Sequence, residues 1–120
     1  MKHIEAWRYA IAHYEKLQSE GADILPQLEL TKKAAASKFG PRFFPISYAH
    51  ALNLSAALDY EESLDMPSIS VRYKGDNKFE ISYLPNGHQT RNMTKTACHR
   101  SQSWTLLQSL FLRLDNESGK

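Results

Sequence analysis

The sequence lacks the features that mark several large classes of protein. Cys98 is its only cysteine, so the chain has no internal disulfide and no cysteine-based zinc cage. No apolar run approaches the roughly 20 residues that cross a bilayer. The opening stretch MKHIEAWRYAIAHYEK carries charge throughout, unlike the apolar core of a secretory signal. These absences favour a protein of the reducing cytoplasm with no membrane anchor.

Sequence signatures of catalysis and of cofactor binding are also missing. The chain contains no GxSxG, GxxxxGK[ST], GxGxxG or HExxH motif. No two of its five histidines are spaced i, i+4, and the neighbours Cys98 and His99 would point apart on a helix. We therefore expect a non-catalytic protein that holds no metal and no cofactor.

The composition is that of an ordinary globular protein. With 120 residues, 42% of them hydrophobic and 23% charged, the chain fits a single domain over residues 1–120. The pattern along it predicts an α+β fold. We expect a mainly helical part (1–66), a two- or three-stranded antiparallel β-meander (67–94), a C-terminal helix packed on the sheet (95–114) and a loose tail (115–120).

The clearest pattern is the stretch Ser68–Leu84, in which apolar and polar residues alternate. Strict alternation with β-branched and aromatic residues is typical of strands that bury one face. The segment 75–77 tolerates left-handed backbone, which predicts a three-residue hairpin loop with Lys74 opposite Lys78. The same register pairs Arg72 with Glu80, Val71 with Ile81, and Ile69 with Tyr83.

Helices are predicted before this hairpin. Apolar residues at spacings of three and four predict a helix over 3–20. Thr31 is a candidate N-cap for an alanine-rich second helix, while Pro26 either opens a helix or lies in a loop. A third helix is predicted from Ser47 to about Tyr60.

Another turn and a last helix are predicted after the hairpin. Asn86-Gly87 favours a two-residue turn, which leads into a short edge strand over 89–93 with Thr90 opposite Tyr83. The last helix begins between residues 94 and 101 and ends near Leu114.

Positive charge is concentrated in the second half of the chain. Residues 1–66 have a net charge of −2 and residues 67–120 a net charge of +4. The run His88–Arg100 contains no acid, and the polar face of the hairpin carries three cations against Glu80. Cations beside short hydroxyl and amide groups are typical of phosphate recognition, although a solvated loop explains the same run. The candidate nucleic-acid-binding residues are Arg72, Lys74, Lys78, Arg91, Lys95 and Arg100.

Two orders of elements resemble nucleic-acid-binding families. A helix over 47–60, three strands and a last helix are similar to the order in double-stranded-RNA-binding domains. Thr94-Lys95-Thr96 matches in part the Ser-Lys-Lys-type clamp of that family, and Gln102-Ser103 stands where the family has Ala-Ala. Three helices followed by a hairpin resemble a winged helix with Tyr73–Phe79 as the wing tip, but the helix over 47–60 contains no Lys or Arg. Neither resemblance assigns the chain to a family.

A protein–protein interaction module, such as a small regulator or inhibitor that covers a partner's surface, is the competing expectation. It would use the acidic segment 59–65, the loop Arg42–Pro45 or an unpaired sheet edge. Such an edge accepts a strand from another chain, and it would also allow oligomers.

Overall fold

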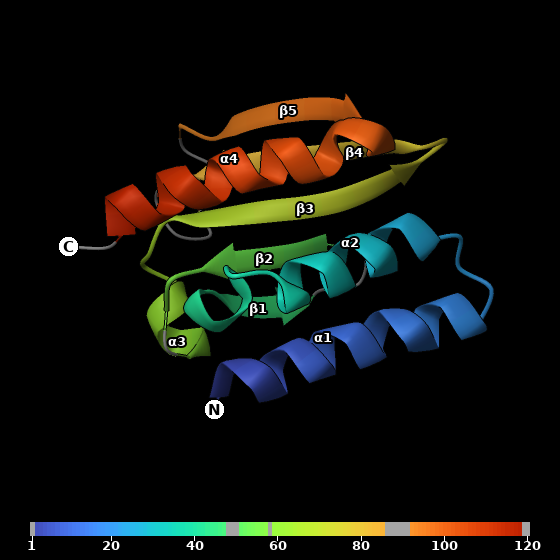
Figure 1. Ribbon diagram of the computed structural model, residues 1–120, viewed down its shortest axis with the longest axis horizontal. Coiled ribbons are helices and arrows are strands. Elements are labelled where there is room, and N and C mark those ends of the chain that lie inside the picture. Colours follow the sequence, from blue (N-terminus) through green and yellow to red (C-terminus); the bar gives the residue numbers. More distant parts are fainter. Residues whose placement is uncertain (1, 48–50, 58, 86–91, 119–120) are drawn as a thin grey trace.

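The computed structural model describes residues 2–47, 51–57, 59–85 and 92–118. The fold is α+β, with five strands in one antiparallel sheet of order β1-β2-β3-β4-β5 (Figure 1). The helices are α1 (Lys2–Ser19), α2 (Leu25–Ala36), the short α3 (Tyr60–Ser63) and α4 (Arg100–Ser118), and a 3-10 turn, η1, spans Gly40–Arg42. The strands are β1 (Phe44–Ser47), β2 (Ala51–Ser55), β3 (Ser68–Gly75), β4 (Lys78–Leu84) and β5 (Thr94–His99).

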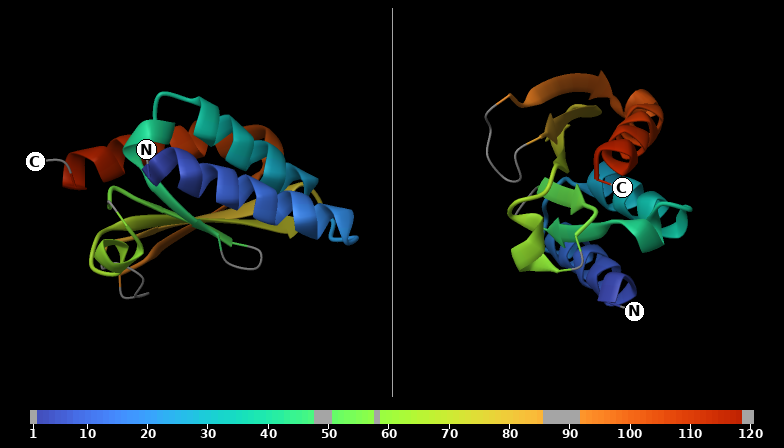
Figure 2. Two further views of the ribbon diagram at one scale, coloured as in Figure 1. Left: turned by 90° about the horizontal axis from the view of Figure 1, so that it is seen from below. Right: turned by 90° about the vertical axis from the view of Figure 1, so that its left-hand side faces the viewer.

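One face of the sheet carries the three long helices; we call the other, of which α3 covers one end, the open face of the sheet (Figure 2). The long helices α1, α2 and α4 lie together on one side of it, and the short helix α3 lies on the other (Figure 2). The C-terminal helix packs on the sheet as predicted. The prediction of two or three strands was too low, because the sheet has five.

The predicted hairpin over Ser68–Leu84 is confirmed, with one change at its turn. The pairs Arg72–Glu80, Val71–Ile81 and Ile69–Tyr83 all occur in β3 and β4. However, Gly75 rather than Lys74 pairs with Lys78, so the loop is the two residues Asp76 and Asn77, whose φ angles are 54° and 62°. Two left-handed residues give a turn that matches the twist of the strands. Lys74 is left without a partner where the register shifts.

The next strand begins later than predicted. Thr94 lies opposite Tyr83, where Thr90 was expected, so the register is displaced by four residues. The predicted turn at Asn86-Gly87 and residues 89–91 lie outside the described residues. Because β5 runs to His99, α4 begins at Arg100, and it continues to Ser118 through most of the predicted loose tail.

The helix predicted from Ser47 to Tyr60 is wrong. The described part of this segment forms the end of β1, β2 and the approach to α3. Leu52 and Leu54 of β2 pair with the buried Val71 and Ile69 of β3. These alternating apolar residues therefore extend the core face of the sheet by one strand. Both family resemblances require a helix here, so the fold supports neither.

The acidic residues after this segment begin a helix rather than end one. Asp59 is the N-cap of α3, and its carboxylate accepts a hydrogen bond from Glu62 N at 2.9 Å. Glu61 and Glu62 lie in the first turn, where negative charge is stabilising.

The first two helices place a buried amide against the sheet. α1 is close to its prediction, but α2 begins at Leu25, so Thr31 lies inside that helix rather than at its N-cap. Gln27 of α2 is fully buried; its Nε2 donates to Val71 O at 3.0 Å, and its Oε1 accepts from Tyr73 N at 2.9 Å. The pairing of β2 with β3 ends at Arg72, so Gln27 satisfies the backbone of β3 at the end of that pairing.

The hydrophobic core lies between the covered face of the sheet and the three long helices. Phe111 of α4 stacks on Phe39 and Phe43, with ring centroids 4.7 and 5.0 Å apart. An ion pair between Arg42 and Asp115 also links η1 to α4. Aromatic stacking of this kind contributes beyond the burial of area alone. The two halves of the chain therefore share one core.

Candidate nucleic-acid interface

The cations of β3, β4 and β5 lie mainly on the open face of the sheet. Phe79 and Ile81 are buried in the core, so the alternating residues Lys78 and Glu80 point to the other side. Partners in an antiparallel register share a face. Arg72 lies opposite Glu80, Lys95 opposite Ser82 and His99 opposite Lys78.

The structure brings four of the predicted site residues together on three adjacent strands. Arg72, Lys74, Lys78 and Lys95 are all exposed. Neighbouring strands lie about 4.8 Å apart, so the three strands span about 10 Å. We call Arg72, Lys74, Lys78 and Lys95 the basic face.

One carboxylate lies within the basic face. Glu80 is the only acid in β3, β4 and β5. Its Oε2 lies 3.8 Å from Lys95 Nζ. Within the described ranges, no ion pair involves Arg72 or Lys78, so their charges are available to an anion from solution.

Arg100 does not belong to the basic face. Its guanidinium lies 3.1 Å from Glu29 Oε1 of α2 and donates to Asn77 Oδ1 at 3.2 Å, and its backbone N donates to Asn77 O at 2.7 Å. These contacts turn the side chain toward the helices and fix the hairpin turn to the start of α4. Arg91, the sixth predicted residue, lies outside the described residues.

His99 lies beside the basic face, and its position was missed from the sequence. It is exposed opposite Lys78, and its Nδ1 accepts a hydrogen bond from Ser101 N at 3.1 Å, which caps the start of α4. With Nδ1 as the acceptor, the neutral ring carries its proton on Nε2. Alternation along 95–99 was the available signal, but it was not used because the strand was predicted over 89–93.

The other end of the open face is acidic and covered. Ser55 and Ser68 are fully buried there, and α3 lies on this side of the sheet (Figure 2). The α3 segment carries Asp59, Glu61, Glu62 and Asp65. A polyanion is therefore attracted to the hairpin end of the open face and repelled from the α3 end.

The strand aromatics give the basic face no stacking platform. Tyr73, Phe79 and Tyr83 all belong to the covered side of the sheet, where Phe79 and Tyr83 are buried. Polar neighbours such as the half-buried Ser70 remain. The face offers charge and short hydrogen-bond donors rather than rings, which suits phosphates better than bases.

Three further findings concern the cysteine thiol, metal binding and membrane-spanning helices. Burial raises the pKa of the Cys98 thiol, which disfavours the reactive thiolate. Within the ranges that the structure describes, no three His, Cys, Asp or Glu residues converge to hold a metal ion, and no helix is long and apolar enough to cross a membrane. Comparison of the chain with models of protein families, with curated proteins and with solved structures found no match.

Proposed function

We propose that the chain binds nucleic acid by contacting phosphates with the open face of β3, β4 and β5. The observation that carries this proposal is the basic face itself: four exposed Lys and Arg residues against the single acid Glu80. Lysine and arginine contacts to phosphates supply most of the affinity of sequence-independent binding.

The composition of the face defines the expected binding mode. Because the aromatic rings of β3 and β4 point into the core, nucleic-acid bases gain little from stacking on this face. Discrimination between sequences is therefore expected to be weak. Four phosphate contacts correspond to non-specific binding, for which dissociation constants of about 10⁻⁴ to 10⁻⁶ M at physiological salt are typical.

A titration across a salt series tests the proposal. Fluorescently labelled single- and double-stranded DNA and RNA are titrated with the protein, and anisotropy is recorded between about 50 and 200 mM salt. We expect binding of all four probes, with an affinity that falls steeply as salt increases. Undetectable binding at the lowest salt concentration overturns the proposal.

A second candidate function, pairing with a strand of another protein, is favoured by the position of β5. Within the described residues this strand has a strand neighbour on one side only, β4. An unpaired edge accepts an extended peptide through main-chain hydrogen bonds. Such pairing would slow amide hydrogen exchange over 94–99 when the partner is added, whereas phosphate binding to Lys78 and Lys95 leaves the outer edge exchanging freely.

A further inference from the structure

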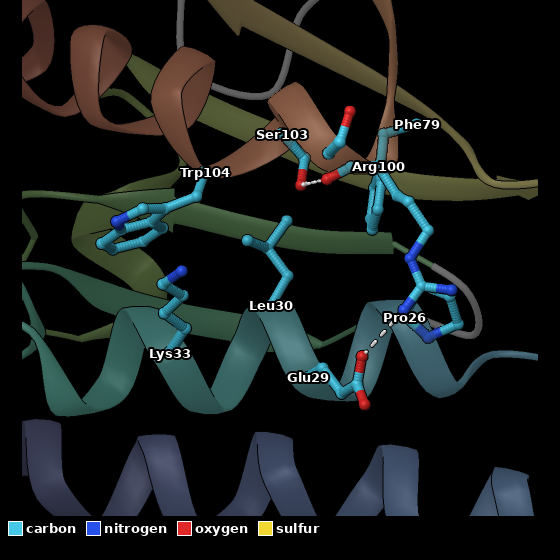
Figure 3. A pocket seen from close by; sticks show the side chains of 9 residues that line it. Pro26, Glu29, Leu30, Lys33, Phe79, Arg100, Ser103 and Trp104 are labelled. Atoms are coloured by element: carbon cyan, nitrogen blue, oxygen red, sulfur yellow. Dashed lines mark hydrogen bonds and ion pairs between the residues drawn. The ribbon is translucent and has the colours of Figure 1, made fainter.

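A pocket of about 300 Å³ lies between α2 and α4, on the helix side of the sheet (Figure 3). Two contacts between the helices frame it. Glu29 Oε1 lies 3.1 Å from Arg100 Nη2, and the Lys33 ammonium lies 5.4 Å from the centroid of the Trp104 ring. Within each helix the two framing residues are four positions apart, so they lie on the same helix face one turn apart.

The floor of this pocket is buried. Leu30 and Pro26 of α2, Phe79 of β4 and Ser103 of α4 line it beneath the framing side chains. The Ser103 hydroxyl donates to Arg100 O at 2.8 Å, so its proton is already engaged within the helix and its oxygen can only accept a further hydrogen bond. The side chains of Leu30, Pro26 and Phe79 in the floor are apolar but expose little surface, and the half-buried Trp104 supplies an aromatic wall.

The rim of the pocket carries two cations and one carboxylate. Arg100 is held by Glu29, whereas Lys33 forms no ion pair with any described residue and rests over the Trp104 ring. Lys33 and Trp104 point toward each other from opposite helices (Figure 3). An ammonium over an aromatic face is held weakly, so a stronger anionic partner draws it away and uncovers the ring.

We propose that this pocket binds a small molecule that combines a flat ring with a phosphate group, the chemistry of a nucleotide. The ring stacks on Trp104 above the floor residues Leu30 and Phe79, and the phosphate lies between Lys33 and Arg100. The pocket volume is at the lower limit of the range for small-molecule sites, which suits one ring system with its phosphate. The inference does not depend on the basic face, because none of the residues Arg72, Lys74, Lys78 and Lys95 lines the pocket.

The test uses two tryptophan indoles as reporters in the full chain. Nitrogen-15 NMR spectra are recorded while adenosine 5′-monophosphate is added. We expect a saturable shift of the Trp104 indole N–H signal, whereas the Trp7 indole is an internal control because it is buried and donates to Gly40 O at 2.7 Å. Absence of a saturable Trp104 shift at millimolar nucleotide overturns the proposal.

Three variants, one of them a matched control, identify the anion contact. Lys33→Ala is expected to weaken nucleotide binding about tenfold, as loss of a charged hydrogen bond does. Its neighbour Lys32 pairs with Glu15 at 3.5 Å outside the pocket, so Lys32→Ala should leave the affinity unchanged. Glu29→Gln is expected to tighten binding, because it removes the carboxylate that competes for Arg100. Equal effects of Lys33→Ala and Lys32→Ala would contradict the assignment.

Further ligands separate the two parts of the chemistry and the two sources of a nucleotide. Adenosine and inorganic phosphate should each bind more weakly than the nucleotide; if phosphate alone binds as well, the ring contact is refuted. A 5′-phosphorylated oligonucleotide that displaces the nucleotide from the Lys78→Ala/Lys95→Ala variant indicates the end of a strand as the source, and failure to displace indicates a free nucleotide. Both results support the pocket, and the variant weakens the competing contact of the oligonucleotide with the basic face.

Discussion

Lys95 Nζ lies 3.8 Å from Glu80 Oε2, on a diagonal between β5 and β4, because the register partner of Glu80 is Ala97. The Glu80 side chain is 28% exposed and that of Lys95 is 54% exposed, so the carboxylate is the more recessed of the two. Arg72 lies opposite Glu80 on the other neighbouring strand. Glu80 is thus the group within the chain that competes with a phosphate for the basic face.

Removal of this competing charge is expected to strengthen nucleic-acid binding. Glu80→Gln should lower the dissociation constant about two- to fivefold at low salt, which corresponds to the small free energy of an exposed ion pair. Anisotropy titrations with labelled nucleic acid measure the dissociation constant. Glu15→Gln is the matched control, since Glu15 forms a similar exposed pair with Lys32 on α1 and α2. Weaker binding by Glu80→Gln would contradict the proposed interface.

Each cation of the basic face should contribute to the salt dependence of nucleic-acid affinity. Lys78→Ala and Lys95→Ala are each expected to weaken binding to all sequences alike and to reduce the slope of log affinity against log salt by about one unit. Lys32→Ala removes the same charge from the helix side of the sheet and should change the slope little. If Lys78→Ala and Lys32→Ala behave alike, long-range net charge rather than the basic face drives binding.

The buried amide of Gln27 should make a large contribution to stability. Gln27→Leu leaves Val71 O and Tyr73 N without a partner, and we expect the free energy of unfolding to fall by about 2–4 kcal/mol. Urea unfolding followed by circular dichroism measures the change. Gln102→Leu on the exposed side of α4 is the control, with a change within about 0.5 kcal/mol. A change of that small size for Gln27→Leu would show that the amide is dispensable.

A pH-dependent contribution to the free energy of unfolding is expected where α4 ends over the sheet. The Tyr83 hydroxyl donates to Glu117 Oε1 at 2.6 Å, and this hydrogen bond, together with Arg113, lowers the pKa of Glu117. A carboxyl whose pKa is lower in the folded state stabilises the fold above its unfolded pKa of about 4.3, and this contribution is lost as pH falls through the folded value.

Unfolding measurements on the protein and on Glu117→Gln across a pH series test that contribution. At pH 7 the protein should be more stable than Glu117→Gln, and the difference should shrink toward pH 3, because the protonated carboxyl no longer gains from its partners. Tyr83→Phe removes the same hydrogen bond, so its stability deficit relative to the protein should likewise be smaller at pH 3 than at pH 7. A difference between the protein and Glu117→Gln that is independent of pH would refute the role of this pair.

Local patterns predicted the parts of the fold in which neighbours in sequence are also partners in space. The hairpin register followed from alternation within Ser68–Leu84, and α1 followed from its apolar spacing. In contrast, Leu52 and Leu54 suit either a helix face or a strand. What decides between them is the adjacent β3 edge, which local spacing does not show. That tertiary contact makes the segment a strand.

The candidate site was predictable in part for the same reason. Arg72, Lys74 and Lys78 share the hairpin, so their common exposure was evident from the pattern. The position of Arg100 depends on Glu29, 71 residues away, and the exposure of His99 depends on the displaced register of β5. Gln27 gave no signal, because a single glutamine in an amphipathic helix is ordinarily a surface residue.

Phosphate contact by the basic face is tested by the salt dependence of single-stranded DNA binding, measured for the protein and for Lys78→Ala/Lys95→Ala. Phosphate contact by the four cations predicts a slope of about −3 for the protein, and loss of two contacts predicts about −1.5 for the variant. The variant should also bind at least tenfold more weakly at the lowest salt concentration. Equal slopes and equal affinities for the two proteins would show that Lys78 and Lys95 do not contact the phosphates.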